Sequence, residues 1–189
     1  MVWTVLAIAL LMPQGDSLRD AVNLGRTHDA ALYAAFLAGY RLTPSGDVDS
    51  VDVITEFRRA AMLVRQHADA GEYSYNENNL ATDLAPFRGL VTFIAQVRLN
   101  PLNTYVKPPS YDMYVRTGAS TKPIAPSAFK RDPVLPVGAV GPGNTIIGVK
   151  LEATFSRADL SGASDPYLII TNDRGEVIWQ ARIDLSRFR

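Results

Sequence analysis

The sequence predicts an α+β protein, in which a helical N-terminal half is followed by an antiparallel β-sandwich. Three observations lead to this prediction. Apolar residues recur at helical spacing through residues 28–69, whereas apolar and polar residues alternate after Pro86. The four residues 172–175 then separate two strand-like runs, as the turn of a β-hairpin does.

Composition limits the chemistry that is open to this chain. Its 189 residues suit one domain, or one domain with an appended subdomain, and can bury a core without disulfides. The formal net charge is zero, so we expect no nucleic-acid partner. The chain has no cysteine, which excludes disulfides, zinc–thiolate centres, iron–sulfur clusters and thiol nucleophiles.

The N-terminus, MVWTVLAIALLMPQGDS, contains an apolar run over residues 2–12 that only Thr4 interrupts. A membrane-spanning helix needs about 20 residues, so this run is too short to span a bilayer. It is typical of a signal peptide, which we place at 1–15, although no Lys or Arg precedes it. The prediction is a periplasmic or secreted protein without a membrane segment in its mature chain; the first turn of a buried helix is the alternative.

A helical region is predicted over residues 16–85. Asp16-Ser17 would cap a first helix, 28–41 would form a second, and a short helix would lie near 77–85. The clearest helix is expected over 51–69, where one apolar stripe comprises Val53, Phe57, Ala61, Val64 and Ala68.

Caps and anchors can also be assigned to the helix expected over 51–69. Ser50 or Asp49 would cap its start, and Gly71 would end it. Arg58 and Arg59 would anchor it on the sheet, through Glu56 or through an acidic residue on a strand.

The β-sandwich is predicted over residues 86–189. Alternation of apolar and polar residues indicates a strand over 89–100, and further strands are predicted over 109–118, 146–156, 167–172 and 176–185. Gly175 suits the positive φ of the turn between the last two strands. Residues 118–144 are rich in proline and glycine, so we expect a long irregular connection there.

Charge is spread unevenly along the chain. Residues 45–83 hold eight acidic side chains against three arginines, whereas residues 98–131 hold six basic side chains against Asp112. The two segments either face each other or water, or they form two separate patches for partners.

One short motif resembles a known metal site. Asp159, Gly162 and the run 164–167 give the pattern D-x-x-G-x-S-D-P-Y, which resembles the first calcium loop of C-two-type phospholipid-binding domains. The resemblance implies that Asp159 and Asp165 bind calcium, and it adds a C-two-like sandwich to the immunoglobulin-like one as a candidate fold.

The number of ligands weighs against this calcium site. Calcium takes about 6–8 oxygen ligands, and the later acidic loop of that family has no room in the 24 residues after Asp165. The acidic run of Asp47, Asp49 and Asp52 could contribute only if the fold brings it close. The alternative interpretation is a turn, in which Gly162 adopts an unusual φ and Pro166 opens a strand.

Hydrolase chemistry has weaker support. Ser127 and Lys130 have the S-x-x-K spacing of penicillin-binding proteins, but the partner motifs of that family are absent. The two histidines, His28 and His67, belong to no metal-binding or catalytic motif. No nucleophile elbow or phosphate-binding loop occurs.

Two longer stretches, ITEFRRAAMLV (54–64) and LNPLNTYVKPPSYDMYV (99–115), together with the ending RIDLSRFR, resemble an uncharacterised family of small exported bacterial proteins. The resemblance implies export and assigns no activity. We therefore predict a non-catalytic exported protein without a resident cofactor, which has a structural role or binds a protein or envelope component. A calcium-dependent binding module is the alternative, and a hydrolase is the third hypothesis.

Overall fold

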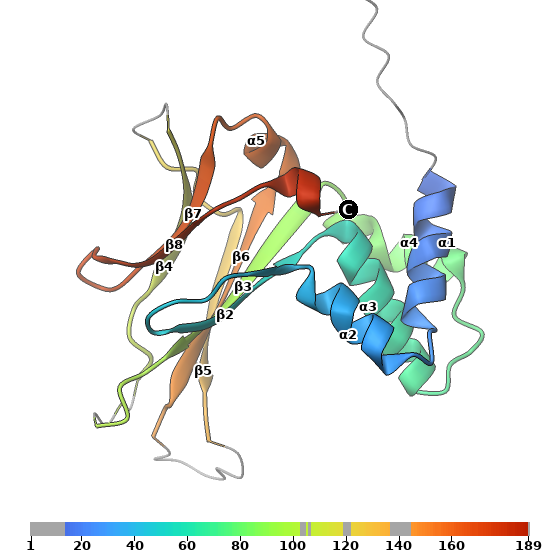
Figure 1. The fold of residues 1–189 in the computed structure, drawn as a ribbon, viewed down its shortest axis with the longest axis horizontal. Helices are drawn as coiled ribbons and strands as arrows, with labels where there is room; N and C mark the ends of the chain where they lie inside the picture. Colours follow the sequence, from blue (N-terminus) through green and yellow to red (C-terminus); the bar gives the residue numbers. More distant parts are fainter. Residues whose placement is uncertain (1–13, 103–104, 106, 119–121, 137–144, 189) are drawn as a thin grey trace, which may run out of the picture.

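The computed structural model describes residues 14–102, 105, 107–118, 122–136 and 145–188. These residues form five α-helices and eight strands in two antiparallel sheets, which confirms the α+β class (Figure 1). The helices α1 to α4 gather at one side of the molecule, and the two sheets lie at the other. Residues 1–13 of the predicted signal peptide lie outside the described part.

The helical lobe comprises α1 (Gln14–Gly25), α2 (Ala30–Ala38), α3 (Glu56–Asp69) and α4 (Glu77–Leu84), with a 3₁₀ turn at Ala85–Phe87. Polar side chains begin three of these helices, because the first N–H groups of a helix need acceptors: Asp29 caps α2, Thr55 caps α3 and Asn76 caps α4. The helices α1, α3 and α4 share one apolar cluster, which includes Ala61 and Val64 of α3.

A strand occupies the start of the helix predicted over 51–69, so that boundary was wrong. Strand β2 spans Val48–Ile54 and pairs with the two-residue strand β1 (Arg41–Leu42). The β-branched Val51 and Val53 alternate with Asp52, and both valines are fully buried in the sheet core. The region 16–85 is therefore not purely helical, and α3 begins only after Thr55, in place of the predicted caps Ser50 and Asp49.

The larger sheet has the strand order β1-β2-β3-β6-β5, in which β3 is Leu90–Arg98, β6 is Gly148–Ser156 and β5 is Ala128–Val134. Strand β5 lies in the stretch predicted to be an irregular connection. It is an edge strand with little buried surface, and it carries Lys130, Arg131, Asp132 and Pro133. Charged residues and proline protect an edge strand from pairing with another chain. They also interrupt the alternation of apolar and polar residues by which a strand is predicted.

The smaller sheet has the order β4-β7-β8, in which β4 is Asp112–Thr117, β7 is Pro166–Thr171 and β8 is Val177–Arg182. The predicted hairpin between the last two strands is confirmed, with Gly175 at a φ of 76°. A 3₁₀ turn at Leu185–Arg187 follows β8.

One apolar cluster receives side chains from both sheets, including Phe93 and Phe155 of the larger sheet and Trp179 of the smaller one. The chain returns to the helical lobe at its end, where the ring of Phe188 packs on Tyr40 at 5.5 Å between centroids. Among the described residues, no helix is both long and apolar enough to cross a membrane.

Candidate functional site

The predicted calcium loop folds as a short helix and a turn. Asp159 lies in the first turn of α5 (Arg157–Ser161), where its N–H donates to the Ser156 hydroxyl. Gly162 has a φ of −79°, so the prediction that it adopts an unusual φ was wrong. Asp165 takes the left-handed conformation in its place, with a φ of 50°, which aspartate tolerates better than most side chains.

The carboxylate of Asp165 already has a cationic partner. Its Oδ1 atom lies 2.6 Å from Nε of Arg182, on strand β8. The two residues border an open, polar cavity of about 480 Å³, which Arg157 and Asp184 also line. An accepted hydrogen bond from Ser186 lowers the pKa of Asp184 below its ordinary value.

The acidic run at 47–52 lies at another place in the fold. Asp49 and Asp52 are on β2 and pair with arginines: Asp49 with Arg98 at 3.3 Å, and Asp52 with Arg58 at 2.9 Å. The pair of Asp49 and Arg98 joins the acidic segment of the sequence to the basic one. In the part of the chain that the structure describes, no three His, Cys, Asp or Glu residues gather as a metal-binding group.

The structure separates the residues of the hydrolase hypothesis. Ser127 directly precedes β5 and donates its hydroxyl to the carbonyl of Thr154, while Lys130 lies within the extended strand. His28 borders a cavity beside α1 and α3, and His67 on α3 contacts Glu72 and stacks on Tyr75. Ser127 thus belongs to the larger sheet, and both histidines belong to the helical lobe.

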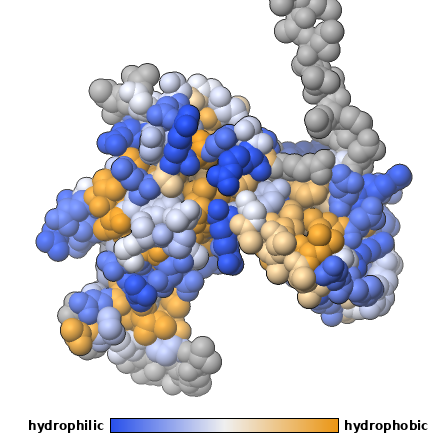
Figure 2. Space-filling view, in the orientation of Figure 1, coloured by the Kyte–Doolittle hydropathy of each residue, from blue (hydrophilic) through white to orange (hydrophobic). Residues whose placement is uncertain are grey.

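Helix α2 carries the most unusual surface of the described residues. Its nine residues, AALYAAFLA, are all apolar, yet none of them is buried. Leu32 is 52% exposed, and five alanines face water. Figure 2 shows this surface as a pale orange area over the helical lobe. A helix that is apolar all round is ordinarily buried, so α2 is the element whose sequence fits its exposure least.

A groove with a volume of about 550 Å³ runs between α2 and α3. We call it the α2–α3 groove. The side chains that line it come from two helices: Tyr33 and Leu37 from α2, and Arg58, Arg59, Met62, Leu63, Arg65, Gln66 and Asp69 from α3. Most of these positions of α3 lie on the side of the helix that faces away from the cluster shared with α1 and α4, whereas Leu63 lies at the boundary and also packs against that cluster.

Arg58 connects α3, which forms one wall of the groove, to the larger sheet. Its side chain is only 6% exposed, and its NH1 group donates to the carbonyls of Tyr40 and Val53. Its NH2 group donates to Asp52, which confirms the prediction that a strand acid anchors this arginine. The remaining Nε–H of Arg58 is buried and has no hydrogen-bond partner among the described residues. An unpaired donor of this kind is costly, because water cannot satisfy it.

Arg59 and Tyr33 add polar groups to the groove. Arg59 donates to the hydroxyl of Thr92 and lies over the ring of Phe87, and no carboxylate of the described residues is within ion-pair distance of it. Burial lowers the pKa of Arg59 from its ordinary value, and the charge of Glu152 opposes this. Burial also raises the pKa of the Tyr33 hydroxyl, against the charge of Arg65.

Sequence reasoning did not single out this groove. The run 28–41 was predicted to be helical, and its lack of polar residues over 30–38 would have indicated a buried helix, so the exposure of α2 is seen only in the structure. Arg58, Arg59 and Arg65 all lie on α3, and the groove forms only because α2 lies beside that helix.

Comparison with protein-family models, curated proteins and solved structures finds no match for this chain.

Proposed function

We propose that this is an exported, non-catalytic protein whose role is to bind another protein through its helical lobe. The exposure of α2 supports this proposal most directly, because nine consecutive apolar residues without a buried member favour a contact surface. The proposed contact surface consists of α2 and the α2–α3 groove, and we refer to it as the helical face.

In this proposal the two sheets act as a sandwich-type scaffold. Residues of both sheets contribute to one apolar cluster, which favours a rigid support for the helical face. We further propose that the chain belongs with the small exported bacterial proteins that it resembles, on the residues at 54–64 and 99–115.

Photocrosslinking in the native host tests the helical face. A photoreactive amino acid replaces the exposed Leu32 in one variant, and Val177, which is 49% exposed on the β7–β8 hairpin, in a control variant. We expect a discrete protein adduct from position 32 only. The adduct should disappear when Ala34→Glu places a charge on α2. Equal adducts from both positions, or no adduct at position 32, would contradict the proposal.

Export has its own test. Mass spectrometry of the protein from its native host should show a mature chain that begins near residue 16. An intact Met1 would contradict cleavage of the proposed signal peptide.

Calcium binding by Asp159 and Asp165 remains the alternative function, and the thermal shift described in the Discussion tests it. The present geometry favours the interaction role, since Asp165 is held by Arg182.

A further inference from the structure

We propose that the α2–α3 groove binds an acidic amphipathic helix, with apolar side chains against Met62 and Leu63 and a carboxylate beside Arg59. This inference rests on the proposed function, because it names the chemistry of the partner at the same surface.

The groove offers apolar contact along most of its length. Leu37 forms part of the α2 wall, while Met62 and Leu63 lie on α3, and Met62 is 39% exposed. A groove between two helices suits a helix that presents apolar anchors at positions i, i+3, i+4 and i+7. The alanines of α2 have short side chains, so a helix backbone can approach them closely.

The charge around the groove is positive. Three arginines line it, Arg58, Arg59 and Arg65, against the carboxylate of Asp69. Asp52 pairs with Arg58 and Asp69 pairs with Arg65, while the charge of Glu152 acts on Arg59 without an ion pair between the two among the described residues. An acidic partner complements this charge, whereas a basic one is repelled.

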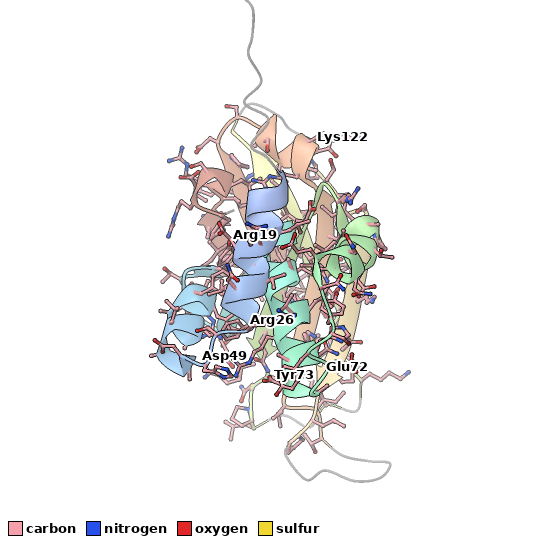
Figure 3. The ribbon with its side chains drawn as sticks, turned by 90° about the vertical axis from the view of Figure 1, so that its right-hand side faces the viewer. Arg19, Arg26, Asp49, Glu72, Tyr73 and Lys122 are labelled. Carbon is pink, nitrogen blue, oxygen red and sulfur yellow. The ribbon has the colours of Figure 1, made fainter. Side chains whose placement is uncertain are left out.

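The positions of the three arginines on α3 also bear on the uneven charge distribution of the sequence. Residues 45–83 are acidic overall, and Arg58, Arg59 and Arg65 are their only arginine or lysine residues. The fold gathers all three into this groove, while Asp47 and Asp49 lie at the sheet and Glu72 follows α3. Figure 3, which looks at the helical lobe, places Asp49 and Glu72 near one end of it. The positive charge is therefore local, within a segment of opposite charge.

Two designed peptides test the proposal with the full mature chain. One is an amphipathic helical peptide with a leucine stripe flanked by glutamates; the other has lysine in place of every glutamate. Titration followed by fluorescence anisotropy at low and moderate salt should show binding of the acidic peptide, about tenfold or more tighter than the basic one. Added salt should weaken the binding of the acidic peptide.

Two variants at one exposed position provide a matched control. Met62→Glu should reduce the affinity for the acidic peptide by about tenfold or more, because it adds a like charge to the groove, whereas Met62→Lys should retain it. Arg59→Gln should lower the affinity for the acidic peptide only. Arg182→Gln, at the polar cavity near Asp165, should leave the affinity for both peptides unchanged. Circular dichroism confirms that each variant is folded.

Several outcomes would overturn the inference. These are equal binding of the two peptides, an equal loss in Met62→Glu and Met62→Lys, binding to vesicles of phosphatidylcholine and phosphatidylglycerol in place of the acidic peptide, or self-association that Ala34→Glu abolishes. If neither peptide binds but the crosslink from position 32 persists, the helical face is correct and the acidic helix is wrong. If the crosslink is also absent, the proposed function itself fails.

Discussion

At the scale of single residues, two arginine–aspartate pairs of β2 differ in burial. Asp52 pairs with the buried Arg58, and Asp49 pairs with the exposed Arg98. Arg58 donates to the carboxylate of Asp52, to the carbonyl of Val53 on β2 and to the carbonyl of Tyr40 in the turn after α2, and so fixes the helical lobe on the larger sheet. Asp49, three residues before Asp52, holds Arg98 at the surface instead.

The two aspartates of β2 should therefore differ in their effect on stability. Asp52→Ala leaves the buried guanidinium of Arg58 without its anion, and should lower the free energy of unfolding by about 3 kcal/mol. Asp49→Ala breaks an exposed pair and should cost less than about 1 kcal/mol. Urea denaturation measures both. Equal losses in the two variants would contradict the role of Arg58 as a buried anchor.

The hydroxyl of Tyr75 should make the protein less stable at alkaline pH. Burial and its hydrogen bond to Asp83, 2.8 Å long, raise the pKa of its hydroxyl well above the ordinary value. Above a pH of about 10 the unfolded chain loses this proton while the folded protein keeps it, so stability falls as pH rises. Below that pH the contribution is fully present.

Tyr75→Phe should make this alkaline loss shallower. It should not abolish it, because burial also raises the pKa of Tyr33 and Tyr111. At neutral pH the variant should lose about 1 kcal/mol with the hydrogen bond to Asp83. The measurement is the urea midpoint at several pH values, and an unchanged alkaline slope would count against this account.

Calcium addition should leave the melting temperature unchanged, and so should EDTA. Asp165 is paired with Arg182, and Asp159 lies on α5 with its side chain exposed. A ligand that binds the native state must stabilise it, by about 2.7 kcal/mol at 100 times its dissociation constant. A rise in melting temperature that Asp165→Asn removes would establish the calcium module instead.

At the scale of elements, the close contact of α1 with α3 depends on one glycine. Gly25 ends α1, and a Cβ atom added there would lie 2.6 Å from the carbonyl oxygen of Ala61 and 2.7 Å from Cβ of Val64. Those distances are shorter than any normal contact, so a side chain would force the two helices apart. The cluster shared by α1, α3 and α4 would lose its packing with them.

Gly25→Ala should accordingly destabilise the protein by about 1–3 kcal/mol. Gly162→Ala is the control, because its added Cβ meets nothing closer than 3.4 Å and its φ of −79° suits alanine. That control should stay within about 0.5 kcal/mol of the wild type. Thermal and urea unfolding compare the two variants. A tolerated Gly25→Ala would show that α1 can shift on α3 without loss.

At the scale of the whole molecule, the helical lobe and the sheets meet through few but specific links. Arg58 and Arg59 reach the larger sheet from α3, and Phe188 at the chain end packs on Tyr40. Helix α2 lies on the uncovered surface of the lobe, and its apolar residues face outward beside the α2–α3 groove. We propose the function at this surface for two reasons. The two sheets bury their apolar side chains in one shared core, and in the open polar cavity near Asp165 that carboxylate is already paired with Arg182.

The sequence determined most of the strands and the α+β class by itself. Strands β3 and β6 place apolar residues at alternate positions, as a sheet with one buried face requires, and β7 is a short continuous apolar run bounded by turn residues. Gly175 marked the hairpin because its turn requires a positive φ. The sequence also indicated that Arg58 anchors its helix on the sheet through Glu56 or a strand acid, and the structure selects the strand acid Asp52.

Tertiary structure alone decided the rest. Strand β5 exists because β6 supplies its hydrogen bonds, and its own charged, proline-containing sequence does not signal a strand. The pairing of β2 with β3 overrode the helical pattern before Thr55. The candidate groove arises where α2 lies beside α3, and a local pattern cannot predict which faces of two helices meet, because that depends on contacts between residues far apart in the chain.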